Sequence, residues 1–85
     1  MINYIICEDE KVLISKYIHI IEKFMINYDI NYKINTFSEY NDNFYKCAGL
    51  DTFKIFILDI KTPNGSGIDA ARIIREEYDD QHLQN

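Results

Sequence analysis

Hydrophobic residues along the chain alternate between short strand-like runs and longer helical patterns. The segment from Ile2 to Cys7 is short and rich in β-branched residues, which favours a strand. The residues after it recur at steps of three and four, which predicts one apolar helix face made of Leu13, Ile14, Tyr17, Ile18, Ile21, Phe24 and Met25. The chain therefore begins with a pattern typical of a βα unit.

A second unit follows with a weaker pattern. The segment from Asn31 to Phe37 alternates in polarity, as expected of a strand at the edge of a sheet. Ser38 is expected to cap a helix from Glu39 to Ala48, which Gly49 ends. The predicted apolar side of this helix consists of Tyr40, Phe44, Tyr45 and Ala48.

The third strand-like segment, Phe53 to Leu58, is nearly continuously apolar, which indicates a parallel strand with helices on both faces. A Gly- and Pro-containing loop from Thr62 to Gly67 then precedes a helix, predicted to turn Ile68, Ala71, Ile74 and Tyr78 toward the sheet. Right-handed crossovers would join the three strands into one open parallel sheet. We therefore predict an α/β fold in one domain over residues 1–80, with a polar tail at 81–85.

Composition and charge narrow the possible functions. The 85 residues are 47% hydrophobic and 27% charged, close to ordinary globular proteins, which disfavours extensive disorder. A net charge of -5 without clustered Lys and Arg argues against nucleic-acid contact by this chain. No apolar run approaches the length of a membrane span, and Cys7 and Cys47 have neither zinc-site nor disulfide-framework spacing. We expect a cytosolic protein with two buried thiols, and we interpret its tyrosines as core and surface filler.

Acidic residues stand at the ends of two predicted strands. Glu8, Asp9 and Glu10 follow the first strand, and Asp59 ends the third. Ligands of open parallel sheets bind beyond the carboxyl ends of the strands, so these carboxylates are expected to converge. Hard oxygen ligands suit Mg²⁺, and a metal there would let Asp59 attack phosphorus to form an acyl phosphate. The alternative is that each acid only caps a turn or opens a helix.

Two stretches resemble a known family. "FILDIKTPNGSGIDAARIIRE" resembles the phosphoacceptor region of two-component response-regulator receiver domains, with Pro63 four and Gly67 eight residues after Asp59, where they would shape the loop. "YIICEDEKVL" is similar to the family's first strand and acidic pair, here Glu8 and Asp9. The Glu-Asp form is similar to receivers attached to LytTR-type DNA-binding domains. The resemblance implies a flavodoxin-like fold and, in the full-length protein, a transcription regulator.

The resemblance also implies roles for particular residues. Asp59 would accept a phosphoryl group from the phosphohistidine of a histidine kinase. Asp9 would bind Mg²⁺ directly, Glu8 would do so through water or a hydrogen bond, and the backbone carbonyl of Lys61 would complete the protein ligands. The chain would then be a cytoplasmic phosphoacceptor regulatory domain rather than an enzyme.

The chain departs from the family in length. The family has five βα units in strand order 2-1-3-4-5, whereas the pattern here supplies three, in order 2-1-3. The family's Ser or Thr after the fourth strand and its Lys after the fifth have no counterpart before Asn85. We therefore expect slow unaided phosphorylation. The strand from Phe53 to Leu58 would also lie at the sheet edge, where it could pair with a second copy to form a homodimer.

Two other functions remain open. The missing donor residues favour a degenerate receiver that acts as a phosphorylation-independent protein-interaction module. A metal-dependent phosphatase of the haloacid dehalogenase kind also ends a strand in a nucleophilic Asp. That family has an Asp-x-Asp pattern, and Lys61 stands where its second Asp should be.

Overall fold

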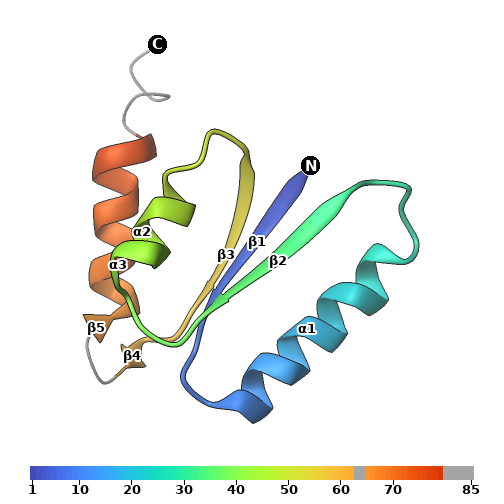
Figure 1. The fold of residues 1–85 in the computed structure, drawn as a ribbon, viewed down its shortest axis with the longest axis horizontal. Coiled ribbons are helices and arrows are strands. Elements are labelled where there is room, and N and C mark those ends of the chain that lie inside the picture. The colour runs from blue at the N-terminus through green and yellow to red at the C-terminus, as the bar shows by residue number, and fades with distance from the viewer. Residues whose placement is uncertain (63–64, 80–85) are drawn as a thin grey trace.

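A three-stranded parallel sheet organises the chain. The computed structural model describes residues 1–62 and 65–79. The sheet consists of β1 (Ile2–Cys7), β2 (Tyr32–Phe37) and β3 (Phe53–Leu58) in the order β2-β1-β3, with helices between successive strands (Figure 1). The predicted α/β class and the strand order 2-1-3 are confirmed, and the arrangement is consistent with a flavodoxin-like fragment.

The register of the sheet aligns the carboxyl ends of its strands. Cys7 of β1 is level with Phe37 of β2 and with Leu58 of β3. One residue further, the Glu8 amide donates to the Phe37 carbonyl and the Asp59 amide donates to the Cys7 carbonyl, both at 2.9 Å. The residues after β1 and β3 therefore leave the sheet side by side.

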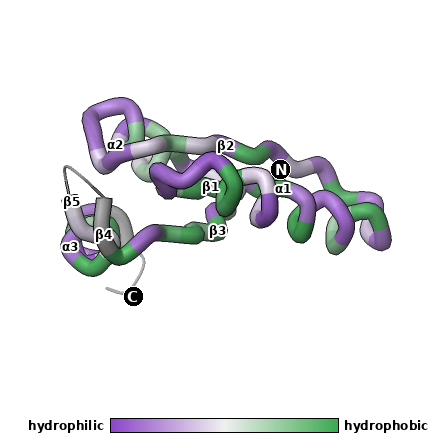
Figure 2. The backbone as a smooth tube through the Cα atoms, turned by 90° about the horizontal axis from the view of Figure 1, so that it is seen from below, coloured by the Kyte–Doolittle hydropathy of each residue, from purple (hydrophilic) through white to green (hydrophobic). Residues whose placement is uncertain are grey.

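One face of the sheet packs against α1 (Lys11–Met25), along which hydrophobic and hydrophilic residues alternate (Figure 2). Ile21 and Met25 of this helix are buried against Tyr4 and Ile6 of β1. The Tyr4 hydroxyl donates a hydrogen bond to the Met25 sulfur at 3.3 Å. Side chains alternate between the two faces of a strand, so every second residue of β1, such as Tyr4 and Ile6, faces α1.

The predicted apolar face of α1 is wrong at one position. Phe24 is 55% exposed, and its ring lies 5.1 Å from that of Tyr28 rather than in the core. On the helix Phe24 lies at the margin of the stripe that Ile21 and Met25 define, so it is turned away from the sheet.

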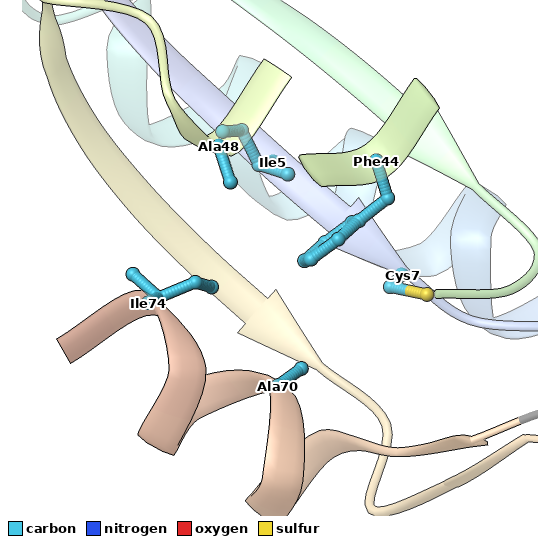
Figure 3. Close-up of a cluster of buried hydrophobic side chains, with 6 residues drawn as sticks. All are labelled: Ile5, Cys7, Phe44, Ala48, Ala70 and Ile74. Carbon is cyan, nitrogen blue, oxygen red and sulfur yellow. The ribbon is translucent and has the colours of Figure 1, made fainter. Parts of the chain in front are cut away.

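The opposite face of the sheet packs against α2 (Asp42–Ala48) and α3 (Gly67–Ile74). Figure 3 shows six buried side chains of this core, contributed by β1, α2 and α3: Ile5, Cys7, Phe44, Ala48, Ala70 and Ile74. Phe56 and Leu58 of β3 pack against this cluster, whereas Ile55 and Ile57 pack on the α1 side. The continuous apolar run of β3 is explained by these two covered faces.

The helix α2 begins later than its sequence predicted. The expected cap at Ser38 is wrong: Asn41 is the N-cap, and its side chain accepts a hydrogen bond from the Phe44 amide at 3.0 Å. Gly49 ends the helix as predicted. Residues 38–40 connect β2 to this cap without forming a helix, and the Tyr40 hydroxyl reaches the Asp59 carbonyl at the carboxyl edge of the sheet.

The predicted buried face of α3 is confirmed at Ile74 and wrong at Ile68 and Ala71. Gly67, Ala70 and Ile74 are buried, whereas Ile68 is 65% exposed and Ala71 is also exposed. At the start of the helix, Gly67 approaches the chain after β3 so closely that a Cβ atom would lie 2.2 Å from the Asp59 carbonyl oxygen, which is consistent with Gly67 facing inward in place of Ile68.

A short antiparallel pair leads into α3. It joins β4 (Lys61–Thr62) to β5 (Gly65–Ser66), and the Ser66 hydroxyl then caps the helix by accepting from the Ile68 amide at 3.2 Å. The π-helix η1 (Arg75–Asp79) follows α3. The predicted positions of Pro63, of the Tyr78 side chain and of the tail at 81–85 lie outside the described residues.

Self-association through β3 stays a prediction, and the fold says where to test it. Within residues 1–62 and 65–79, β3 forms its strand pairing with β1 alone. Charged side chains on an edge strand oppose its pairing with another chain. The Lys54 ammonium donates to the carbonyls of Ala48 and Leu50 at 2.9 and 2.5 Å, so its charge lies at the end of α2 and the loop that follows it. We expect a concentration-dependent dimer in analytical ultracentrifugation.

A charged variant sharpens this test. Phe53, at the start of β3, is 68% exposed, and Phe53→Lys is expected to shift the equilibrium toward monomer. Ile26→Lys, at a position 81% exposed after α1, is the matched control and should leave the association unchanged. A monomeric wild type at high micromolar concentration would refute the dimer.

Candidate metal centre

Three carboxylates meet at the carboxyl edge of the sheet. Glu8 and Asp9 follow β1 directly, and Asp59 follows β3. One carboxylate oxygen from each of the three residues lies within 4.8 Å of the other two. The register explains this proximity, because β1 and β3 are neighbours whose last residues, Cys7 and Leu58, are level. The structure thus brings together the acids that the sequence places at two strand ends.

Glu8 is the buried member of the cluster, with 5% of its surface exposed. Its Oε2 accepts a hydrogen bond from the amide of Glu10 at 3.1 Å, and Glu10 is the residue that immediately precedes α1. Burial raises the pKa of the Glu8 carboxyl; the charges of Asp59 and Asp9 raise it further, and the hydrogen bond from Glu10 acts in the opposite direction. An ionised Glu8 is therefore costly here, and a nearby cation would reduce that cost.

The chemistry of the donor set fits a hard divalent cation. All three side chains offer carboxylate oxygens, which suit Mg²⁺ or Ca²⁺ better than a soft metal. Asp9 is exposed and Asp59 is half-buried, which leaves the cluster open on one side. Because Mg²⁺ retains several waters and takes few protein ligands, a small open cluster is compatible with it. Binding of Mg²⁺ stays a prediction.

The backbone of Asp59 is held from two sides. Its amide donates to the Cys7 carbonyl of β1 at 2.9 Å. Its carbonyl accepts a hydrogen bond from the Tyr40 hydroxyl at 2.6 Å. Sequence reasoning missed Tyr40, because a tyrosine 19 positions away carries no motif that links it to Asp59. The sequence placed Tyr40 only on the apolar side of the helix predicted from Glu39 to Ala48.

Gly67 is required by space rather than by an unusual dihedral angle. A Cβ atom there would lie 2.2 Å from the Asp59 carbonyl oxygen and 2.9 Å from the Tyr40 hydroxyl oxygen. No glycine in the described ranges has a positive φ. The predicted loop-shaping role of Gly67 is thus given a specific basis: close approach of the helix start to the backbone of Asp59.

Two neutral groups lie beside the acids. Burial raises the pKa of the Cys7 thiol to about 11, and it also raises the pKa of the Tyr40 hydroxyl above its ordinary value. Both groups therefore remain protonated near neutral pH and add no charge to the cluster. Cys7 is a buried free thiol as expected, whereas Cys47 is only half-buried.

The remaining predicted site residues lie on the loop after β3. Lys61 is two residues beyond Asp59 and pairs with Ser66 across the β4–β5 ladder. Its backbone carbonyl as a metal ligand stays a prediction. Pro63 lies outside the described residues.

No family model matches the chain, and comparison with curated proteins and with solved structures finds no similar protein. The resemblance to receiver domains therefore depends on the residues of the chain and on their arrangement.

Among the residues that the structure describes, no helix has the length and apolar character needed to cross a membrane.

Replacing Glu8 by Gln is expected to raise the free energy of unfolding at neutral pH without metal. Gln keeps an oxygen for the Glu10 amide and removes the buried charge. Because the folded-state pKa of Glu8 is raised, its stabilising contribution is complete at pH values below its unfolded pKa and is lost as the pH rises through the folded pKa. As the pH rises from the unfolded-state pKa of Glu8 through its folded-state pKa, the wild type should therefore lose stability relative to Glu8→Gln.

Urea unfolding at a series of pH values measures this difference. Glu22→Gln, at an exposed position of α1, is the control and should follow the wild type. If the free energies of unfolding of the wild type and Glu8→Gln changed in parallel with pH, the ionised form of Glu8 would not be unfavourable in the folded state.

Replacing Gly67 by Ala is expected to destabilise the protein by about 1–3 kcal/mol, because the added methyl group meets backbone that cannot move freely. Gly65→Ala is the matched control. The atoms nearest to its Cβ would belong to the Tyr40 side chain, the first at 3.1 Å, so we expect a loss under about 1 kcal/mol. Thermal unfolding of the two variants checks the order, and an equal loss in both would show that contact with Asp59 does not require glycine.

Proposed function

We propose that this chain is a receiver fragment of two-component signalling, in which Asp59 accepts a phosphoryl group from the phosphohistidine of a histidine kinase. The observation that carries the proposal is the meeting of Glu8, Asp9 and Asp59 at the carboxyl edge of the parallel sheet. In the order β2-β1-β3, the helix after β1 and the helix after β3 pack on opposite faces of the sheet. Ligands of open α/β sheets bind at such a switch point, and the three carboxylates lie there.

The transfer consists of one displacement at phosphorus. A carboxylate oxygen of Asp59 attacks, an O–P bond forms, and the P–N bond to the donor imidazole breaks. The electron pair of that bond stays on the imidazole nitrogen, which takes a proton from solvent. The products are an aspartyl phosphate and a neutral histidine. The half-buried position of Asp59 beside an exposed Asp9 supports access by a bulky donor.

The residues present fit a bound Mg²⁺, which would supply positive charge between the phosphoryl oxygens and the carboxylates. Asp9 and Asp59 would hold the ion directly, Glu8 would act through water or a hydrogen bond, and the Lys61 carbonyl would complete the protein ligands. The chain itself contributes the fixed position of the attacking group. A flexible aspartate would lose part of the benefit of proximity.

The proposed role has consequences for context. A histidine kinase draws its phosphoryl group from ATP, so the chain would act in the cytoplasm. The chain would be a regulatory phosphoacceptor rather than an enzyme, and any DNA contact would belong to an attached output domain. The net charge of -5 supports this division, because it disfavours contact with a phosphate backbone.

Intact mass spectrometry tests the phosphoacceptor role. The wild type is incubated with Mg²⁺ and acetyl phosphate, and then with phosphorylated kinase domains. We expect one phosphoryl adduct that is lost in Asp59→Asn and in the presence of a chelator. Asp51→Asn changes an exposed aspartate outside the cluster and should retain the adduct.

Other outcomes lead to other functions. Absence of an adduct with every donor would exclude the phosphoacceptor role and favour the phosphorylation-independent interaction module. Continuous release of inorganic phosphate that requires Asp59 would instead favour the haloacid dehalogenase kind of phosphatase.

A further inference from the structure

Tyr40 links the turn before α2 to the residue proposed as phosphoacceptor. It lies between the end of β2 and Asn41, the N-cap of α2. Its hydroxyl donates to the Asp59 carbonyl at 2.6 Å, a short bond for two neutral groups. Its ring meets that of Phe44 edge to face, with centroids 4.9 Å apart and planes at 90°. One end of the side chain is thus anchored in the core and the other on Asp59.

The loop after β3 closes around the same side chain. A Cβ on Gly65 would lie 3.1 Å from the Tyr40 ring, and one on Gly67 would lie 2.9 Å from its hydroxyl oxygen. Two glycines thus give Tyr40 room beside the chain that follows Asp59. The tyrosine is enclosed by the core and by this loop, which limits the rotamers available to its side chain.

The hydroxyl has the chemistry of a permanent donor. A phenol hydroxyl is protonated near neutral pH, so it donates to the Asp59 carbonyl, which can only accept. The Asp59 amide is already bound to the Cys7 carbonyl of β1. The two hydrogen bonds therefore hold the amide and the carbonyl of Asp59, one from the sheet and one from the turn before α2.

We propose that Tyr40 is a positioning residue for Asp59, whose hydroxyl holds the aspartate backbone so that its carboxylate stays within reach of Glu8 and Asp9. The backbone dihedral angles of Asp59 set the direction of its Cα–Cβ bond and hence the place of the carboxylate. Without the phenol hydroxyl, the peptide group after Asp59 loses one of the contacts that fix its orientation. Because this role serves the reaction of Asp59, it rests on the proposed function.

The test compares two variants that each lose one hydrogen-bonded tyrosine hydroxyl. Tyr40→Phe keeps the ring and its contact with Phe44, and it removes the hydroxyl's bond to Asp59 together with its contact with the Cys7 thiol. Tyr4→Phe is the matched control: its hydroxyl bonds to the Met25 sulfur on the opposite face of the sheet. Titration calorimetry with Mg²⁺, the rate of adduct formation with acetyl phosphate and the urea midpoint are measured for each protein.

We expect Tyr40→Phe to bind Mg²⁺ about 10-fold more weakly, as is common when a group that orients a ligand is removed. Its rate of adduct formation should fall by a similar factor at subsaturating Mg²⁺. Tyr4→Phe should match the wild type in both, although the two variants lose similar stability. A purely structural role for Tyr40 would shift the urea midpoint and leave the Mg²⁺ affinity unchanged, which would overturn the positioning role.

The outcomes also separate this role from the proposed function. A wild type that binds Mg²⁺ without forming an adduct would overturn phosphate acceptance, while the difference in Mg²⁺ affinity between the two variants would still decide the role of Tyr40. A wild type that binds Mg²⁺ and forms the adduct, with Tyr40→Phe equal to Tyr4→Phe, would overturn the positioning role alone. A wild type that does neither would overturn both.

Discussion

The pairing of β1 on both of its edges is the constraint on which the rest of the structure depends. Its register sets Cys7 level with Phe37 and Leu58, and the ladder continues one residue further on each side. That continuation fixes the backbone of Glu8 and Asp59 before any side chain is considered. A shift by one residue would turn the apolar side chains of β3 to the wrong faces and separate the carboxylates. The hydrophobic cores on the two faces therefore hold the acidic cluster together indirectly.

The cluster works against the stability of the fold that presents it. Glu8 is buried beside two other acids, and its raised pKa expresses the unfavourable burial and repulsion of its charge. A single hydrogen bond from the Glu10 amide offsets part of this cost. A cation bound there would reduce this repulsion, and proteins tolerate local strain mainly where function requires it.

Aromatic packing connects this site to the core. Phe44 is fully buried, and three rings meet it nearly perpendicularly, at centroid distances of 4.9 to 5.6 Å: Phe37, Tyr40 and Tyr45. Edge-to-face contacts of this kind are directional as well as hydrophobic. They hold the turn between β2 and α2 in the place from which the Tyr40 hydroxyl reaches Asp59. Phe44 thus helps to position the Tyr40 side chain, and Tyr40 in turn contacts Asp59.

The sequence by itself determined the bounds of two strands and the position of the acidic residues at the strand ends. Strand bounds for β1 and β3 follow from apolar runs that end in polar residues, and the meeting of Asp9 with Asp59 follows from strand order. The start of α2 was misassigned although its cap is local, because Ser38 and Asn41 are both residue types that favour the N-cap position. The close approach of Gly67 to Asp59, by contrast, joins two different elements and lies outside any local pattern. The hydrogen bond from Tyr40 belongs to the same class. Only the tertiary structure decided it, since periodicity reports which face a residue occupies and not which backbone atom its side chain meets.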